Sequence, residues 1–212
     1  MKRLKKGIDK TGIWWYNTDM IDISHLEQYK ENNRIEAKEA MGGLPRSIWE
    51  TYSAFANTSG GVILLGVTER KKDKSLHPVD LPDPQRLIAQ FWELVNNKRV
   101  VNINILKKSD ITVEVVQGKE IVVIAVPEAR RSQKPVYIGG NPWTGTYYRD
   151  GEADIRCSEA RVQRMIRAAK GEYRTFEYGK SLLRKAQRTF LFYGNFTVAI
   201  LKSGGNAKNK VV

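Results

Sequence analysis

Two segments of the chain carry apolar residues at helical spacing. In residues 48–56, Ile, Tyr, Phe and Ala fall at positions i, i+4, i+7 and i+8, which predicts a helix with Pro45 in its first turn and an end near Asn57. The same spacing of Leu, Phe, Leu and Val, preceded by an Asp-Pro start signature, predicts a second helix within residues 83–97.

Other segments have the pattern of strands. VILLGV, residues 62–67, is a short continuous apolar run after turn residues, as expected for a strand buried on both faces. Gln117-Gly118-Lys119 offers a tight hairpin, and a turn is expected at residues 139–142. Three β-rich runs should form an antiparallel meander, and two further short strands should flank the later turn: VVNINIL, ITVEVVQ and KEIVVIAVP, then PVYIG and GTYYR.

These elements predict an α+β domain with a mixed or antiparallel sheet flanked by helices. Ser158 should cap a last helix, with apolar residues inward and arginines outward, namely Val162, Met165, Ile166 and Ala169 against Arg161, Arg164 and Arg167. We expect a basic and aromatic N-terminal arm over residues 1–24, one domain over 25–170, and a basic tail over 171–212. The tail segment TFLFYGNFTVAIL suits either an extra strand pair or a partner-binding segment.

Charge narrows the choice of partner. Lys and Arg number 36 against 23 Asp and Glu, giving a net charge of +13, so the surface attracts polyanions. Nucleic acid is the first candidate and an anionic membrane surface the second. Cys157 is the only cysteine and there are two histidines, so the sequence favours neither a disulfide nor a Cys/His zinc site. With neither a signal peptide nor an apolar run of membrane-spanning length, we expect a reducing cytoplasm and no membrane association.

A cation site could be built at Glu31 and Glu36, which precede Lys38. If residues 35–38 are extended, Glu36 and Lys38 lie on one face of a strand, opposite Ile35 and Ala37. This spacing is common, and a solvated charged edge with scattered ion pairs is the alternative interpretation.

A longer pattern adds to this interpretation. Helix, Asn turn, double glycine and buried strand are joined in SAFANTSGGVILLGVTE, residues 53–69, after LPRSIWET at residues 44–51 and before GTYYRDG at residues 145–151. Together with Glu31, Glu36 and Lys38, these motifs closely resemble the Schlafen-type, AlbA-like (AlbA_2) DNA-binding domain that is widespread in bacteria. The resemblance spans residues 25–170 and implies the architecture of one Schlafen core lobe.

The resemblance implies a nuclease site. In relatives that cleave RNA, matching residues are catalytic, and here they would be Glu31, Glu36, Lys38 and Glu69. Glu31, Glu36 and Glu69 would hold Mg²⁺ or Mn²⁺, which prefer carboxylate oxygens, while Lys38 would balance charge in the transition state. Asp73 competes with Glu69 for the place of the third acid.

The glycines and Asn57 have simpler interpretations. Gly60, Gly61 and Gly66 precede a strand instead of opening a helix, and no P-loop or dinucleotide motif is present, so we expect no ATP site. Asn57 either fixes the turn beneath the glutamates or ends the helix. Cys157 is expected to be a structural thiol.

Backbone contacts should come from basic loops and the last helix. The candidate residues are Arg34, Arg46, Arg130, Arg131, Lys134, Arg149, Arg161, Arg164 and Arg167. Aromatic residues could stack on unpaired bases or serve the core: Trp14, Trp15, Tyr16, Trp143, Tyr147 and Tyr148. Three functions stay open: a nucleic-acid-binding module that could have a regulatory role, a metal-dependent endoribonuclease acting on tRNA or rRNA, and a protein-interaction adaptor using the tail. Because Schlafen nucleases resemble two such lobes, a homodimer could supply the second.

Overall fold

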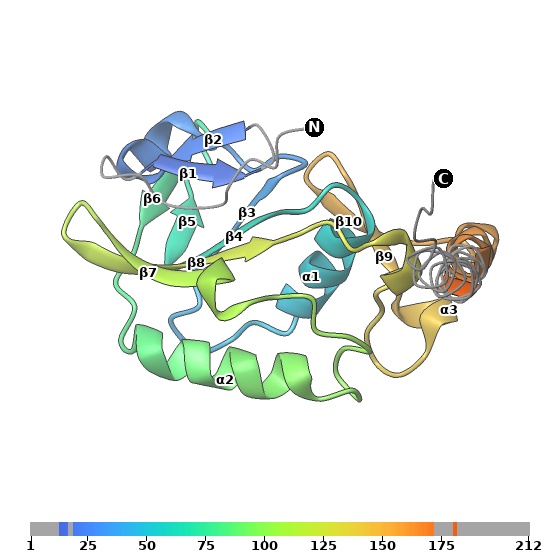
Figure 1. Ribbon diagram of the computed structural model, residues 1–212. Helices are drawn as coiled ribbons and strands as arrows, with labels where there is room; N and C mark the ends of the chain where they lie inside the picture. The colour runs from blue at the N-terminus through green and yellow to red at the C-terminus, as the bar shows by residue number, and fades with distance from the viewer. Residues whose placement is uncertain (1–12, 17–18, 172–179, 182–212) are drawn as a thin grey trace, which may run out of the picture.

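A mixed four-stranded sheet forms the centre of the protein (Figure 1). The computed structural model describes residues 13–16, 19–171 and 180–181. The strand order is β3-β4-β8-β7, with β3 parallel to β4 and the other pairs antiparallel. These strands span Ile35–Lys38 (β3), Gly61–Leu65 (β4), Ile111–Val116 (β7) and Lys119–Val126 (β8). The α+β class and the mixed sheet are confirmed.

The two central strands are buried on both faces, which accounts for their continuous apolar sequences. In β4, Val62 and Leu64 pack into one core cluster, while Ile63 and Leu65 pack into the other. β8 alternates in the same way. The expected burial of the VILLGV run on both faces is therefore confirmed. The hairpin between β7 and β8 also forms as expected, with Gln117 and Gly118 both at positive φ, as a tight two-residue turn requires.

Two helices cover one face of the sheet (Figure 1). They are α1, Ile48–Asn57, and α2, Pro84–Asn96. Asp83 caps α2 by accepting a hydrogen bond from the Arg86 N–H at 2.9 Å, as its sequence predicts. Trp49 of α1 stacks on Phe91 of α2 with ring centroids 5.1 Å apart. α1 also connects β3 to the parallel strand β4, which a hairpin turn could not do.

The opposite face is covered by smaller elements. Ile23 and Leu26 of the 3₁₀ helix η1 pack with Val67 and Leu76 against the sheet. These elements are η1, Ile23–Gln28, the hairpin of β5, Val67–Glu69, and β6, Leu76–Pro78, and the pair β1, Ile13–Tyr16, and β2, Asp19–Asp22. Part of the segment predicted as an arm is thus a strand pair.

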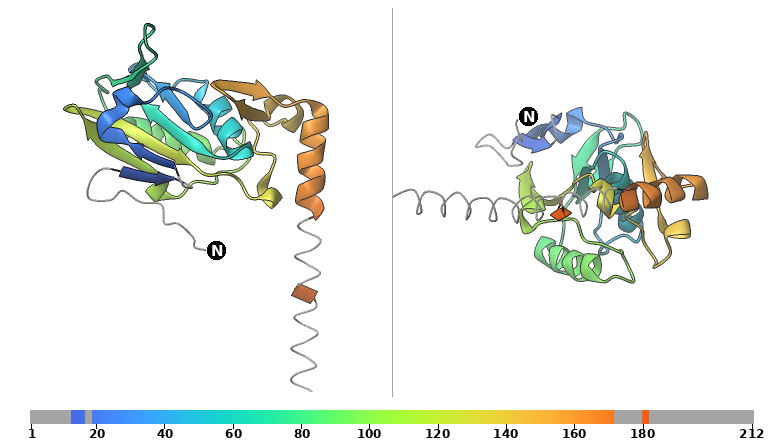
Figure 2. Two further views of the ribbon diagram at one scale, coloured as in Figure 1. Left: turned by 90° about the horizontal axis from the view of Figure 1, so that it is seen from above. Right: turned by 45° about the vertical axis from the view of Figure 1, so that its right-hand side comes forward.

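The C-terminal part of the domain packs beside α1. It contains a short helix α3, Pro142–Gly145, a hairpin of β9, Tyr147–Asp150, and β10, Ala153–Arg156, and helical residues 159–171. Figure 2 shows the helical residues 159–171 at one side of the domain, beyond this hairpin. Ser158 lies before this helix as predicted, and Val162 is buried. The predicted tail, its apolar segment and its adaptor role lie outside the described residues, apart from residues 171 and 180–181.

The predicted strand at residues 100–106 is wrong. Only Val101 forms a bridge there, to Ile138. Asn102 uses its amide to hold another segment, accepting from Tyr137 N–H at 2.7 Å and donating to Pro135 O at 3.2 Å. These side-chain hydrogen bonds hold the segment as a loop. The strand that joins β7 and β8 in the sheet is β4, which pairs with β8. Two short 3₁₀ turns, Lys108–Asp110 (η2) and Arg131–Gln133 (η3), occur in the adjoining loops.

Candidate functional site

The edge of the sheet brings Glu31 beside Glu36. β3 pairs with β4 on one side only, and its Ile35 and Ala37 amides face the other side. The Glu31 carboxylate accepts a hydrogen bond from Ala37 N–H at 2.9 Å, and Asn32 Oδ1 accepts one from Ile35 N–H at 3.1 Å. Glu31 is therefore fixed by the edge strand that carries Glu36.

Glu36 and Lys38 lie on one face of β3, as the two-residue spacing predicts. Lys38 Nζ donates to Glu36 Oε1 at 2.9 Å, and the two side chains are only 13% and 12% exposed. The pair is partly withdrawn from water. The alternative of a solvated charged edge does not describe this arrangement.

Arg149 lies at the centre of a group of charged side chains, the acidic cluster, whose other members are Glu31, Glu36, Lys38, Glu69 and Asp154. Its side chain is 1% exposed, and Nη2 lies 2.7 Å from Glu36 Oε2 while Nη1 donates to Asp154 Oδ1 at 2.9 Å. Asn32 O accepts from Nε and Nη2, and the guanidinium lies 5.2 Å from the centre of the Phe55 ring. This corrects the prediction of Arg149 as a phosphate contact, because its donors are directed into the protein.

Residues far apart in sequence support Arg149. Asp154 Oδ2 accepts a hydrogen bond from Thr51 Oγ1 of α1 at 2.6 Å. Thr58 Oγ1 accepts from Arg149 N–H at 2.9 Å. Sequence analysis missed the roles of Asp154, which belongs to no motif, and of Thr51, the last residue of LPRSIWET, because the two side chains meet only through the packing of β9 and β10 on α1.

Glu69 is the third predicted acid of the cluster. Glu69 Oε1 is buried and accepts no hydrogen bond from the described residues. Burial raises the pKa of Glu31, and the nearby charges of Glu36 and Glu69 raise it further. Asp73, by contrast, is exposed at the hairpin between β5 and β6, where it accepts from Ser75. The geometry therefore favours Glu69 over Asp73.

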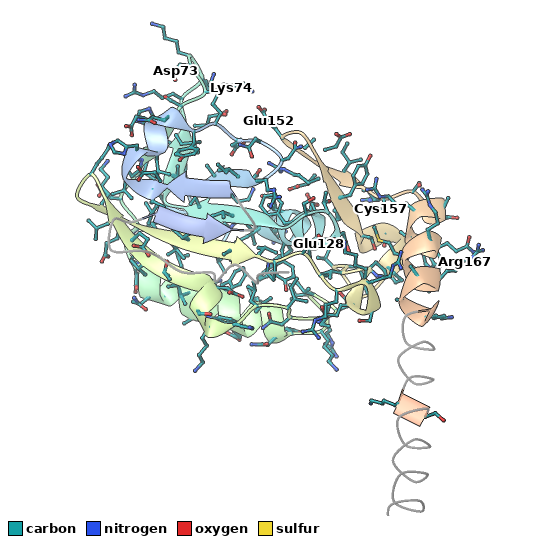
Figure 3. The ribbon with its side chains drawn as sticks, turned by 45° about the horizontal axis from the view of Figure 1, so that its top comes forward. Asp73, Lys74, Glu128, Glu152, Cys157 and Arg167 are labelled. Carbon is teal, nitrogen blue, oxygen red and sulfur yellow. The ribbon has the colours of Figure 1, made fainter. Side chains whose placement is uncertain are left out.

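Two hairpins meet beyond the acids. Lys74, in the β5–β6 hairpin, and Glu152, in the β9–β10 hairpin, form an exposed ion pair of 2.9 Å. Figure 3 shows both near Asp73 at one end of the molecule. Exposed ion pairs of this kind contribute little stability. The contact therefore shows where the two hairpins approach each other, but it adds little to holding them together.

The acids as arranged do not fit a divalent metal. Over the described ranges, no three His, Cys, Asp or Glu residues are grouped closely enough to hold an ion. Glu36 directs both oxygens to cationic side chains, Lys38 and Arg149, and one oxygen of Glu31 is taken by Ala37 N–H. The protein's own cations occupy the positions next to Glu36 that Mg²⁺ or Mn²⁺ would need.

A basic cleft lies on the other face of the β9–β10 hairpin. Tyr148 and Arg149 are consecutive in β9 and so point to opposite faces. Tyr148 carries the Arg161 guanidinium 3.7 Å above its ring. The cleft has a volume of 560 Å³ and is lined by four cationic side chains and one acidic one, Arg131, Lys134, Arg161, Arg164 and Glu128. We call this the basic cleft.

The cations of the basic cleft differ in freedom. Lys134 Nζ is held by Glu128 at 2.8 Å and by Asn57 O at 2.9 Å. Arg131 and Arg164 are exposed. Arg161 is half-buried on Tyr148, so the prediction that it points outward holds only in part. Arg131 and Arg164 are the side chains most available to a phosphate.

The other predicted phosphate contacts are spread over the surface. Arg46, Arg130 and Arg167 are exposed, and Figure 3 shows Arg167 on the outer side of the last helix. Arg34 is half-buried and donates from Nη1 to Ser59 O at 3.2 Å. Their role in binding remains a prediction.

The glycines and Asn57 serve packing. A Cβ at Gly61 would lie 2.7 Å from the Phe55 ring, and Gly66 has a φ of +81° with Leu81 equally close. Asn57 joins α1 to two later segments, donating to the carbonyl oxygens of Val136 and Tyr147 at 2.7 and 2.9 Å. Asn57 is the last residue of α1, as one of the two predictions has it, and its side chain has the further role of joining these segments.

Exposure separates the aromatic candidates. Tyr147 is buried, Tyr148 lies under Arg161, and Trp143 is 41% exposed. Trp143 is thus available to stack on a base, whereas the side chains of Trp14, Trp15 and Tyr16 lie outside the described part.

Cys157 is buried, and burial raises the pKa of its thiol. Among the described helices, none has the length and apolarity needed to cross a bilayer.

The sequence model of the family described as Schlafen, AlbA_2 matches residues 31–158, which include the acidic cluster and the β9–β10 hairpin. A search among curated proteins finds no match.

Several solved structures are similar to the chain, and two of them are described here. One is the N-terminal domain of a RecG-related protein from Nitrosomonas europaea, with 33% identity, a TM-score of 0.48, and coverage of 64% of this chain and 90% of that one. The other is the DIP2311 protein from Corynebacterium diphtheriae, with 18% identity, a TM-score of 0.43, and coverage of 65% of this chain and 24% of that one.

Proposed function

Because the chain belongs to the Schlafen, AlbA_2 family, we propose that it binds nucleic acid by contacts between the basic cleft and the phosphate backbone. The observation that carries this proposal is the convergence of Arg131, Lys134, Arg161 and Arg164 on one cleft with only Glu128 opposing them. The net charge of +13 extends the attraction beyond the cleft.

The basic cleft suits backbone contacts more than base-specific ones. Arginine presents planar donors that match phosphate oxygens, and Arg161 is already oriented by the ring of Tyr148. Lys134 is paired with Glu128, which offsets its charge, so the net positive charge of the cleft lining comes from Arg131, Arg161 and Arg164. Affinity should therefore depend strongly on salt and weakly on sequence.

Salt titration tests this proposal. If four phosphates are neutralised, log Kd plotted against log salt should have a slope of roughly 3 to 4. Arg131→Gln and Arg164→Gln should each weaken binding of a labelled oligonucleotide and lower the slope by about 0.7–0.9 in fluorescence anisotropy. Arg86→Gln, at an exposed position of α2 outside the basic cleft, serves as the matched control. Binding that ignores salt, or that responds equally to all three substitutions, would refute the proposal.

Phosphodiester cleavage is a second candidate function. It is favoured by the buried, unbonded Oε1 of Glu69 beside Glu31 and Glu36, since an orphaned buried oxygen at a functional site calls for a partner. Mg²⁺ or Mn²⁺ would have to compete with Lys38 or Arg149 for Glu36. Incubation of labelled tRNA with Mn²⁺ or a chelator tests this candidate: because the acids as arranged do not fit a divalent ion, metal-dependent cleavage would require Lys38 or Arg149 to release Glu36, and Glu36→Gln should abolish it. Equal cleavage by that variant would place the activity elsewhere.

Homodimer formation is a further part of the proposal. A second copy would double the number of basic clefts available to one strand. Light scattering during size-exclusion chromatography, with and without RNA, tests it directly. A monomer under both conditions would remove it, while leaving the binding role of the basic cleft intact.

A further inference from the structure

A second cleft lies on the far side of the turn that forms one wall of the basic cleft. Its volume is 500 Å³, and its polar rim comes from Asn96, Asn104, Ser132 and Gln133. We call it the amide cleft. Lys98 is its only charged lining residue, and it is exposed. The amide cleft thus offers neutral hydrogen-bonding groups where the neighbouring cleft offers positive charge.

The amides are held in fixed orientations. Asn104 Nδ2 donates to Asn96 Oδ1 at 2.9 Å, and Asn96 Nδ2 donates to Trp92 O at 2.8 Å. Leu106 N–H donates to Asn104 Oδ1 at 2.9 Å. Each amide has two donors and two acceptor sites, so each keeps capacity for a further bond. A ligand would meet groups whose positions are already set.

The polar side chains of the opposite wall, Ser132 and Gln133, form fewer hydrogen bonds within the described residues. Gln133 Oε1 accepts from Arg130 N–H at 3.0 Å, whereas Gln133 Nε2 and the Ser132 hydroxyl form no hydrogen bond with the described residues. Ile103 and the buried Val101 supply apolar surface between the two walls. A flat ligand with polar edges and apolar faces fits such a lining.

One turn separates the two clefts. Within residues 131–134, Arg131 and Lys134 line the basic cleft, and Ser132 and Gln133 line the amide cleft. Asn102 anchors the chain just after this turn through its bonds to Pro135 and Tyr137. Cationic and neutral side chains therefore lie on two sides of one turn.

We propose that the amide cleft takes an unpaired nucleobase of a single strand whose phosphates lie in the basic cleft. This inference rests on the proposed function and names its substrate class. Asn and Gln amides pair with base edges, and the Watson–Crick edges are available in single strands but engaged in duplexes. A phosphate would find only Lys98 in the amide cleft, so the neutral part of a nucleotide is the better occupant.

Three labelled oligonucleotides of equal length test this inference by fluorescence anisotropy: a single-stranded RNA, an abasic single strand and an RNA duplex. Asn104→Leu removes an amide, and Ser132→Leu fills the cleft from the other wall. Each should weaken binding of the RNA single strand at least about fivefold while leaving the abasic strand and the duplex unchanged. Arg131→Leu, the matched control in the basic cleft, should weaken binding of all three.

The outcomes separate the two proposals. If the unmodified protein binds none of the oligonucleotides, the proposed function fails and this inference fails with it. If it binds all three and neither substitution changes the affinity for the RNA single strand, only the amide cleft proposal is overturned. Equal weakening for the abasic strand would also overturn it, since the cleft would then contact the backbone. Should Asn104→Leu unfold the protein, Ser132→Leu alone decides, because Ser132 is exposed.

Discussion

Replacing Arg149 with methionine should cost the protein a large part of its stability. Methionine keeps much of the side chain's apolar volume but leaves Glu36 and Asp154 without the cation that lies 2.7 and 2.9 Å from their carboxylates. The carbonyl of Asn32 also loses two donors. Removing one partner from a buried ion pair costs about 3–5 kcal/mol, because the other charge stays buried and uncompensated.

That loss is large enough to measure by two methods. At about 2–4 °C per kcal/mol for a chain of this size, the midpoint of thermal unfolding should fall by roughly 6–20 °C. Urea denaturation followed by tryptophan fluorescence should show a lower midpoint with an unchanged slope. Arg156→Met, at an exposed position in the same hairpin, is the matched control and should stay within about 0.5 kcal/mol of the unmodified protein.

A second substitution tests the cause. Because Glu36 keeps Lys38 as a partner, the carboxylate left without a cation is that of Asp154, so adding Asp154→Asn to Arg149→Met should recover about 1 kcal/mol or more relative to Arg149→Met alone. The reasoning would be refuted if Arg149→Met lost less than about 1 kcal/mol, if Arg156→Met lost as much, or if the double variant showed purely additive losses.

Three further predictions follow from single contacts. Because burial raises the pKa of Glu31, the stability of the unmodified protein should fall as pH rises through that raised value. Glu31→Gln keeps an acceptor for Ala37 N–H and carries no charge. At pH 7 this variant should therefore unfold at a higher denaturant concentration than the unmodified protein, and it should lose this advantage below pH 4.5. Identical pH profiles would contradict this. Cys157 is buried, and burial raises the pKa of its thiol, so a thiol reagent should label the native protein much more slowly than the urea-unfolded protein; equal labelling rates would be inconsistent. Gly61→Ala should destabilise by about 1–3 kcal/mol in urea unfolding because its methyl group meets the Phe55 ring, and a neutral result would show that the ring can move.

Local rules predicted the parts of the fold that depend on neighbours in sequence. Two-residue alternation placed Glu36 and Lys38 on one face, and Asp83 before Pro84 marked the start of α2. The strand predicted at residues 100–106 does not form, because strand propensity takes no account of amide side chains that bind another segment, as Asn102 does. Composition and alternation alone could not distinguish this loop from a strand.

The composition of the acidic cluster was partly predictable, and its charge balance was not. The family resemblance supplied Glu31, Glu36, Lys38 and Glu69, which the structure brings near one another. Arg149 lies more than a hundred residues after Glu36 in the sequence, and its burial depends on how β9 docks on α1. An arginine in a basic sequence gives no local sign that it faces inward.

The edge of β3 has a consequence for how the protein behaves in concentrated solution. An open strand edge is a template onto which a foreign chain can add. Here Glu31 and Asn32 already occupy the amides of Ala37 and Ile35, and they do so with a carboxylate that brings negative charge to the rim. The same short segment that supplies the first acid therefore also guards the sheet against aggregation, so substitutions chosen to probe chemistry at Glu31 should be checked for changes in solubility.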